Sequence, residues 1–268
     1  MTSDFSKPSF HYTFPNGQTA YILDVPSNFS HAESLNVLGL KEHSPSMVVI
    51  GGASEMSSES KMRVSQLFTK VLAPFAETNN ITVFDGGTNA GIIQMMGQAR
   101  RSIGGSFNLV GIAPKAHAKL PGHSLNLDVV LENSEEIFDL EQHHSHFVLV
   151  PGFIADGEST CWGSESPWLA NCASILAGHY PSITVLINGG KISLSDLELN
   201  LLVGRHTIVV AGSGRLADKI ANTINGTAIS EEDSVQGIVK MYYPNQLSIF
   251  ELTNSLDSLT SRLESHFQ

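Results

Sequence analysis

Short apolar runs that end in glycine organise this sequence. Four of them, MVVIGG, TVFDGG, TVLINGG and IVVAGSG, lead directly into paired or closely spaced glycines. The runs are rich in β-branched residues and do not alternate with polar ones, which is typical of strands covered on both faces of a parallel sheet. Helical patterns separate several of the runs. The alternation predicts an α/β fold with a Rossmann-like, doubly wound, mainly parallel sheet.

The expected strands share this apolar character. They cover residues 47–50, 81–84, 109–113, 127–131, 147–150, 183–187 and 207–210. Apolar side chains at helical spacing predict one helix over residues 64–75, and another over residues 197–202. Ser195 and Glu198 have the spacing of a capping box, so the second helix is expected to begin near Ser195.

Three segments are expected along the chain. Residues 1–40 are expected to form a small β-ribbon and a helix packed on the core, because residues 10–23 alternate apolar and polar side chains around Asn16-Gly17, a hairpin signal. Residues 41–245 make up the Rossmann-like domain. Residues 246–268 are expected to form a C-terminal helix, whose leucines at 252, 256, 259 and 263 either cover the domain itself or form a homo-oligomer such as a dimer.

Composition narrows the classes of function. The formal net charge of −11 argues against nucleic-acid binding, which depends on clustered lysine and arginine. No apolar run approaches the roughly 18 to 20 residues of a membrane span, and no secretory signal is evident. Two cysteines in 268 residues make no disulfide framework. We therefore expect a cytoplasmic protein that binds a small molecule.

The glycine turns predict where that small molecule binds. The carboxyl ends of parallel strands meet at one edge of a sheet, and a glycine turn leading into a helix N-terminus favours an anion there. The alternative is that the glycines serve only tight turns. The residues expected to contact a phosphate-bearing ligand are Gly51, Gly52, Gly86, Gly87, Thr88, Asn89, Gly189, Gly190, Gly212, Ser213, Gly214 and Arg215.

Two cations lie near these turns. Arg215 is at the start of a helix, where a guanidinium suits a phosphate, although it can instead pair with Asp218. Lys115 follows a strand at the same edge and is expected to reach phosphate, with a solvated lysine as the alternative. The turns match neither common nucleotide motif: Ile92-Ile93 stand where a P-loop needs Lys-Ser/Thr, and no strand ends in G-x-G-x-x-G.

Two further groups of residues have open roles. The segment EQHHSHF brings together His143, His144 and His146, but metal ligands usually converge from separate elements. We expect hydrogen-bonded histidines at a strand entry and no metal site. Trp162 lies in a polar loop over residues 155–164, where it either stacks on an adenine or packs on the domain.

Five blocks resemble a known family: VFDGGTNAGIIQMMGQA, LVGIAPK, LEQHHSHFVLV, ITVLINGG and IVVAGSGRLADKIA. In this order they are similar to the SLOG-type (LSDAT) domain in the N-terminal cytosolic region of TRPM channels, over about residues 47–225. The resemblance implies a Rossmann-like domain that binds or senses ADP-ribose or a related NAD-derived nucleotide and needs no cofactor. It also implies that the turns at 87–89, 189–190 and 212–215, with Lys191, contact this ligand. Asp85 departs from the usual uncharged residue, and can repel phosphate or accept a ribose hydroxyl.

A more distant resemblance supplies an alternative. LVGIAPK and VLVPG are similar to segments of LONELY GUY phosphoribohydrolases, whose catalytic glutamate follows a Pro-Gly at a helix start. Here Pro151-Gly152 is followed by a polar insertion and then Glu165, directly before Ser166-Pro167, a good helix start. The glutamate motif and the arginine-lysine pair of those enzymes are incomplete. The alternative function is therefore an N-glycoside hydrolase acting on a nucleotide, with Glu165 as the catalytic carboxylate; otherwise Glu165 binds ribose hydroxyls. A structural subunit with a vestigial pocket is the third class.

Overall fold

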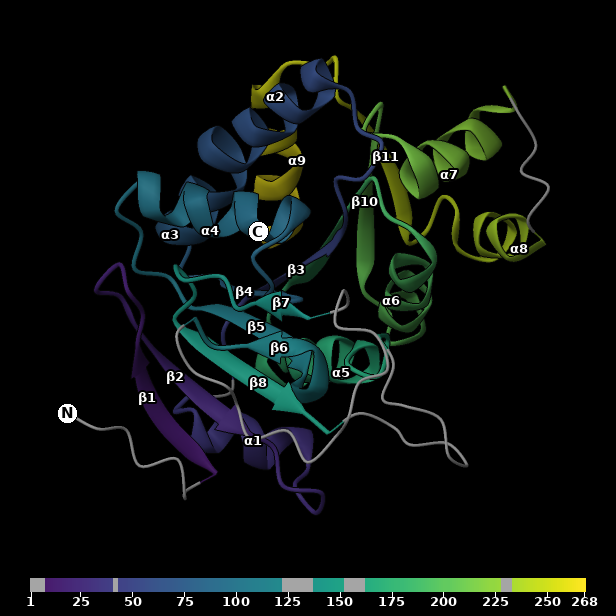
Figure 1. Cartoon of the computed structure of the whole chain (residues 1–268). Coiled ribbons are helices and arrows are strands. Elements are labelled where there is room, and N and C mark those ends of the chain that lie inside the picture. The colour runs from purple at the N-terminus through teal and green to yellow at the C-terminus, as the bar shows by residue number, and fades with distance from the viewer. Residues whose placement is uncertain (1–7, 41–42, 122–136, 152–161, 228–232) are drawn as a thin grey trace.

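A single sheet forms the centre of the molecule (Figure 1). The computed structural model describes residues 8–40, 43–121, 137–151, 162–227 and 233–268. Within them, nine strands are hydrogen-bonded in the order β1-β2-β8-β5-β4-β3-β9-β10-β11. The pair β1–β2 is antiparallel and the other neighbouring pairs are parallel. The expected Rossmann-like α/β fold is confirmed.

The strands of the sheet are β1 (Ser9–Thr13), β2 (Thr19–Asp24), β3 (Ser46–Gly51), β4 (Thr82–Asp85), β5 (Leu109–Pro114), β8 (His146–Val150), β9 (Ser182–Ile187), β10 (His206–Ala211) and β11 (Leu247–Glu251). A separate short pair consists of β6 (Ala118–Lys119) and β7 (Phe138–Asp139). The helices are α1 (His31–Val37), α2 (Ser58–Leu67), the π-helical turn η1 (Phe68–Leu72), α3 (Ala73–Thr78), α4 (Gly91–Ser102), the 3₁₀ turn η2 (Lys115–His117), α5 (Ser166–Ala177), α6 (Lys191–Leu202), α7 (Arg215–Asn225), α8 (Asp233–Tyr242) and α9 (Leu256–Phe267).

Helices cover both faces of the sheet (Figure 1). One apolar layer contains side chains of α2, α3, α4 and α9, and the other contains side chains of α1, α5, α6, α7 and α8. Strand β3 shows the division, since Met47 and Val49 belong to the first layer while Val48 and Ile50 belong to the second. Side chains alternate across a strand, so a strand buried on both faces must be apolar throughout. This accounts for the continuous apolar runs in the sequence.

Six of the seven expected strands are present, and their ends lie within two residues of the expected ones. The seventh, over residues 127–131, lies outside the described residues. The C-terminal segment is partly different. Residues 247–251 form β11 beside β10, and the helix begins only at Leu256, because pairing with β10 gives those five residues a place in the sheet. Leu259 and Leu263 are fully buried against the domain, so the leucine stripe covers the chain's own core.

The N-terminal ribbon extends the sheet. Strands β1 and β2 pair around the turn at Gly17, which has a φ of +85°, and β2 then pairs in parallel with β8, with Tyr21 opposite His146. A third apolar cluster, which includes Phe10, Ile22 and Phe147, lies under this ribbon. Ser30 begins α1 with a capping box, and α1 packs against α5. The β-ribbon and helix expected in this segment are therefore both present.

Candidate functional site

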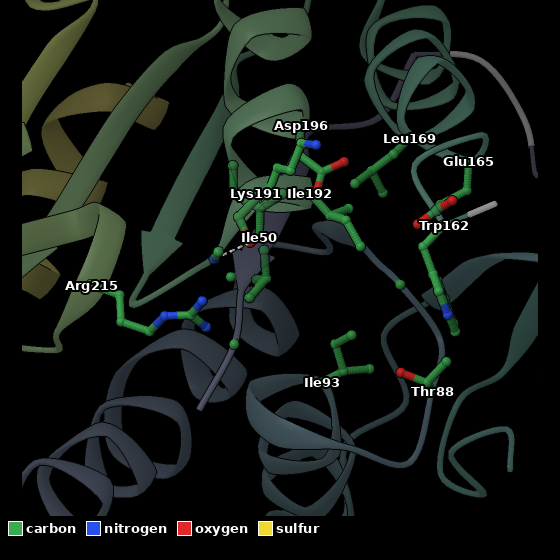
Figure 2. Close-up of a pocket in the computed structure, with 16 residues that line it drawn as sticks. Ile50, Thr88, Ile93, Trp162, Glu165, Leu169, Lys191, Ile192, Asp196 and Arg215 are labelled. Atoms are coloured by element: carbon green, nitrogen blue, oxygen red, sulfur yellow. Dashed lines mark hydrogen bonds between the residues drawn. The ribbon is translucent and has the colours of Figure 1, made fainter. Parts of the chain in front are cut away.

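A pocket of about 370 Å³ lies at the carboxyl ends of the central strands (Figure 2). We call it the glycine pocket, because glycine backbone from the turns after β3, β4 and β9 forms part of its wall. Its volume is in the range of small-molecule sites. The lining residues are Val49, Ile50, Gly51, Gly52, Gly86, Thr88, Ile93, Trp162, Glu165, Leu169, Gly190, Lys191, Ile192, Ser193, Asp196 and Arg215.

The turn after β3 requires glycine. Gly51 has a φ of +136°, and a Cβ added there would lie 1.8 Å from the carbonyl oxygen of Ile187 at the end of β9. The amide of Gly52 donates a hydrogen bond to the same oxygen, at 3.1 Å. Only a residue without a side chain lets the two strand ends approach this closely. The open backbone on this wall is thus a consequence of how β3 and β9 end.

One end of the glycine pocket is cationic. Gly190 is the N-cap of α6 and Arg215 is the first residue of α7, so two helix N-termini meet there. A Cβ added to Gly190 would lie 2.9 Å from Nη2 of Arg215, which places the guanidinium directly over the glycine. Lys191 adds a second cation to the wall. Helix N-termini carry partial positive charge, and both side chains add to it.

Arg215 is held in an unusual conformation and is weakly paired. Its φ of +47° lies in the left-handed region, which a non-glycine residue seldom adopts. Its Nε lies 3.9 Å from a carboxylate oxygen of Glu55, whose side chain is 78% exposed, and such exposed pairs contribute little. Asp218, the alternative partner in the sequence, instead accepts a hydrogen bond from the amide of Gly212 at 2.7 Å.

Helix α6 begins earlier than the sequence indicates. Its first residue is Lys191, directly after the glycine turn, and Ser195 therefore lies inside the helix. The side chain of Ser193 accepts a hydrogen bond from the amide of Gly190 at 3.3 Å, so the helix is capped at the turn itself. The capping-box spacing at Ser195 and Glu198 is a false start signal, and the true start brings the N-terminus of α6 to the pocket.

The other end of the glycine pocket is acidic. Glu165 is the N-cap of α5 and Asp196 lies in α6, and both side chains are buried. Burial raises the pKa of Glu165, while hydrogen bonding from the backbone, including the amide of Gly163 at 2.7 Å, acts in the opposite sense. Burial also raises the pKa of Asp196 to about 7; the nearby Ser166 hydroxyl opposes this and the charge of Glu165 adds to it. Two carboxyl groups that resist ionisation therefore share one wall.

Trp162 lies at this acidic end, opposite Arg215 (Figure 2). Its ring packs against His117, with ring centroids 4.9 Å apart, and against Phe138 at 5.8 Å. The two roles that the sequence left open are compatible, since the ring packs on the domain and also lines the pocket. Residues 155–161 of the loop, including Cys161, lie outside the described residues.

A buried charge network supports the turn after β4. His144 is wholly buried, with Nε2 2.8 Å from Oδ1 of Asp85 and Nδ1 2.9 Å from Glu141. Burial lowers the pKa of His144, but the two carboxylates outweigh it and raise the pKa to about 9. The imidazolium is therefore held between two acids. The same Oδ1 of Asp85 accepts the amide of Gly87 at 2.8 Å, so the network fixes the backbone that follows.

This network includes Asp85 and the histidines that the sequence analysis singled out. Asp85 is buried below the turn and is not among the residues that line the pocket, although its sequence position suggested contact with ligand. The histidines are hydrogen-bonded at the entry to β8, as expected: Nδ1 of His143 lies 2.6 Å from Glu141, and His146 lies beside Ser145 at 2.9 Å.

The structure gathers part of the expected ligand-binding set. Seven of those residues line the glycine pocket: Gly51, Gly52, Gly86, Thr88, Glu165, Gly190 and Arg215. Gly189 lines a neighbouring pocket of about 640 Å³, which shares Gly190, Lys191 and Arg215 with the first. Arg215 therefore lies between two hollows. Whether these residues bind a ligand stays a prediction.

The remaining expected residues do not line either of these two pockets; they are Gly87, Asn89, Lys115, Gly212, Ser213 and Gly214. Lys115 pairs with Asp24 at the end of β2. The hydroxyl of Ser213 accepts the amide of Asn188 at 2.7 Å, which ties the ends of β9 and β10 together. A Cβ on Gly87 would lie 2.8 Å from the Cα of Gly111. Gly87 and Ser213 thus serve the packing of the strand ends, and ligand contact by any of the six residues stays a prediction.

Asp196 is the residue that the sequence reading missed. It lies in the second turn of α6, away from every glycine turn in sequence. A signal is present, however, because Ser193, Asp196 and Asn200 are polar at helical spacing and all three are buried in α6. A polar stripe on the buried face of a helix indicates either an internal hydrogen-bond network or a site, and here Ser193 and Asp196 reach the pocket.

Comparison with known proteins identifies relatives over most of the chain. A family model described as SLOG in TRPM, prokaryote, matches residues 44–259. Transient receptor potential cation channel subfamily M member 2 of Mus musculus is 24% identical over 223 residues, which is 74% of this chain and 14% of that protein. The Rattus norvegicus protein is 26% identical over 208 residues, or 68% of this chain and 13% of its own length.

This chain thus corresponds to a small part of those channel subunits. Among the helices in the described ranges, none has both the length and the apolar character of a transmembrane span. The X-ray structure of TM1055, a structural genomics target, aligns with a TM-score of 0.49 at 16% identity, covering 82% of this chain and 99% of its own.

Proposed function

This chain belongs to the family described as SLOG in TRPM, prokaryote, and on that premise we propose that it is a nucleotide-binding or sensing domain for an ADP-ribose-like, NAD-derived ligand. The observation that carries the proposal is the pair of unlike ends of the glycine pocket. Arg215 and two helix N-termini lie at one end, and Glu165, Asp196 and Trp162 lie at the other. A nucleotide has the same division, with phosphate at one end and ribose and base at the other.

The cationic end suits phosphate for three separate reasons. The N-terminus of α6 presents backbone amides to an anion, whereas the amides of Leu216 and Ala217 at the start of α7 donate to the carbonyls of Gly189 and Asn188, at 3.2 and 3.0 Å. Arg215 offers a planar fork of donors, which matches phosphate oxygens in pairs. Its present partner, Glu55, is exposed and distant, so an arriving phosphate has little to displace. Lys191 adds a point charge on the same wall.

The acidic end suits a nucleoside. The ring of Trp162 packs against His117 and Phe138 and lines the pocket, where it can stack on a base. The carboxyl group of Glu165 can accept hydrogen bonds from ribose hydroxyls. Apolar side chains, including Ile93 and Leu169, complete the wall. A cytoplasmic location is part of this proposal, because two cysteines in 268 residues fit a reducing compartment.

A second function is favoured by the two buried carboxyl groups. In hydrolysis of an N-glycoside, the C1′–N bond breaks, the oxygen of a water molecule bonds to C1′, and one proton of that water leaves with the base. Glu165 would stabilise the positive charge that develops on the sugar. Asp196, with a pKa of about 7, would exchange a proton at neutral pH. Binding without turnover stays the first proposal, since the arginine-lysine pair of the phosphoribohydrolases has no match in the sequence.

One experiment separates these functions. The full chain is incubated with ADP-ribose, NAD or AMP, and both its melting temperature and the products are followed. A ligand that binds only the folded state stabilises it by about 2.7 kcal/mol at a concentration of 100 Kd. We expect such stabilisation by ADP-ribose without products.

The other outcomes are equally specific. If the wild type and the Glu198→Gln control release a free base and Glu165→Gln does not, the protein is a hydrolase and the proposal of binding without turnover is wrong. Glu198→Gln removes one charge from α6 outside both pockets. No stabilisation by any of the three nucleotides would reject both functions and leave a structural role.

A further inference from the structure

Unsatisfied polar atoms are concentrated at the acidic end of the glycine pocket. Among the described residues, Oγ of Ser164, Oγ of Ser166 and Oδ1 of Asp196 are buried and make no hydrogen bond of ordinary geometry, although the Ser166 hydroxyl is close enough to Asp196 to act against the rise of its pKa. The two serines flank Glu165 in sequence, and Asp196 faces the pocket together with Glu165. Folded proteins leave few buried polar groups unpaired, so a group of three around one wall needs an explanation.

Asp196 is the most informative of the three. Its side chain is more than nine-tenths buried, yet it reaches the pocket wall. Leu169 and Ile192 on the same wall are apolar, and the Ser166 hydroxyl is the donor that acts on the carboxyl group of Asp196. A carboxylate has room for more than one donor, and a ligand in the pocket can bring a further one. Glu165 is a second acceptor on the pocket wall, near enough for its charge to act on Asp196, so the pocket is suited to a ligand with two donors.

The pocket geometry indicates which donors these are. Arg215 lies on the opposite side from Glu165 and Trp162 (Figure 2), so a ligand anchored there by phosphate extends toward the carboxyl groups. Vicinal hydroxyls of a sugar are two adjacent, uncharged donors that two neighbouring carboxyl oxygens can accept together. An aromatic base has its own surface at Trp162. The position of the hydroxyls relative to the phosphate is that of a ribose phosphate.

We propose that Asp196, together with Glu165, forms a subsite for the vicinal hydroxyls of a ribose, and that Asp196 makes the pocket select ribonucleotides over 2′-deoxyribonucleotides. This inference rests on the proposed nucleotide-binding function. A site built to hydrogen-bond a hydroxyl rejects the analogue that lacks it, because a buried acceptor is then left unpaired. Asp196 is thus a specificity residue, and the glycine turns and Arg215 supply affinity for either sugar.

The test uses two matched pairs of ligands that differ in one hydroxyl: AMP and 2′-deoxy-AMP, and ribose 5-phosphate and 2-deoxyribose 5-phosphate. Their affinities for the full chain are measured by calorimetry or by displacement of bound ADP-ribose. We expect the wild type to prefer the ribose member at least about tenfold. Asp196→Ala should reduce the preference to less than threefold, with the affinity for the deoxy member changed less than threefold.

Two more variants make the result specific. Asp196→Asn keeps the shape of the side chain and one neutral acceptor, so its preference for the ribose ligand should be intermediate. This variant also provides a result if Asp196→Ala fails to fold. Glu198→Gln removes a charge elsewhere on α6 and should keep the wild-type preference. The melting temperature of each variant shows whether it is folded.

The remaining outcomes overturn the inference or the function beneath it. Equal binding of both members of each pair, or a preference kept by Asp196→Ala, overturns the role of Asp196 while nucleotide binding stands. If ADP-ribose binds but no member of either ligand pair does, the role of Asp196 is also overturned. A phosphate held at Arg215 then does not place the ribose at Asp196. If ADP-ribose fails to bind as well, the proposed function itself is rejected.

Discussion

Gly97→Ala should destabilise the protein, although alanine is the better helix former. Gly97 lies within α4, and a Cβ added there would lie 1.9 Å from Oε2 of Glu141 and 2.2 Å from its Cδ. The carboxylate must therefore move. That carboxylate accepts hydrogen bonds from the amide of His143 at 2.9 Å, from Nδ1 of His143 at 2.6 Å and from Nδ1 of His144 at 2.9 Å. The substitution thus acts on the charge network and leaves α4 itself intact.

The expected loss follows from these contacts. Breaking a buried ion pair costs roughly 3 to 5 kcal/mol, because the remaining charge is left buried without its partner. Alanine returns about 1 kcal/mol through its higher helix propensity. The net loss is therefore about 2 to 4 kcal/mol. For a chain of this size, each kcal/mol lowers the melting temperature by about 2 to 4 °C, so the decrease should be roughly 5 to 15 °C.

Thermal and urea unfolding measure this, with Gly237→Ala as the matched control. Gly237 lies in α8, and a Cβ added there meets nothing within 4 Å. This substitution should stabilise the protein by about 0.5 to 1 kcal/mol through propensity alone. The same exchange in two helices is thus expected to have opposite signs. If Gly97→Ala is as stable as the wild type, the tight contact between Gly97 and Glu141 is refuted.

Three more predictions follow from the charged groups. The pKa of His144 is raised to about 9. The stability that its charged form gives the folded protein is therefore fully present below its ordinary pKa of about 6.5 and is lost as the pH rises through 9. The melting temperature of the wild type should fall over this pH range, and that of His144→Gln should fall less. The pKa of Asp196 is also raised, but for an acid this means that stability falls as the pH rises from its ordinary pKa of 3.8 to about 7, and that the whole cost is present above pH 7. Asp196→Asn should therefore stabilise the protein without ligand by on the order of 2 to 4 kcal/mol at pH 8 and much less at pH 4, and a gain equal at both pH values would contradict a buried, ionising carboxyl. Arg215→Ala should weaken ADP-ribose binding by about 1.5 to 3 kcal/mol, as expected for a charge-assisted hydrogen bond, whereas Arg101→Ala at the exposed end of α4 should leave the calorimetric affinity unchanged.

The sheet was predictable from the sequence because its strands are buried on both faces. A short, continuous apolar run such as Met47 to Ile50 is typical of a strand that is buried on both faces of a sheet. Boundaries that depend on tertiary contacts were not predictable. Residues 247–251 read as a helix until β10 is available to pair with them. The start of α6 is set by the turn at Gly190, while a stronger local signal stands at Ser195.

The candidate site was predictable only in part. Glycine turns identify the correct edge of the sheet, but a turn has an outer and an inner side. Gly51 and Gly190 face the pocket, whereas Gly87 packs on Gly111 and Ser213 ties two strands together. The sequence does not distinguish these positions, because the same backbone freedom serves both. Asp196 comes to the site through packing of α5 against α6, and the polar spacing of Ser193, Asp196 and Asn200 does not by itself distinguish a site from an internal hydrogen-bond network.

The position of β2 has a consequence for synthesis on the ribosome. This strand precedes β8 by a long stretch of sequence, yet it joins the parallel strands of the sheet through β8, with Tyr21 opposite His146. Ile22 and Leu23 are fully buried in the finished protein. Residues 25–145 must therefore be made before β2 finds its partner strand. Until then the nascent ribbon carries apolar side chains and an open hydrogen-bonding edge, which another chain can capture.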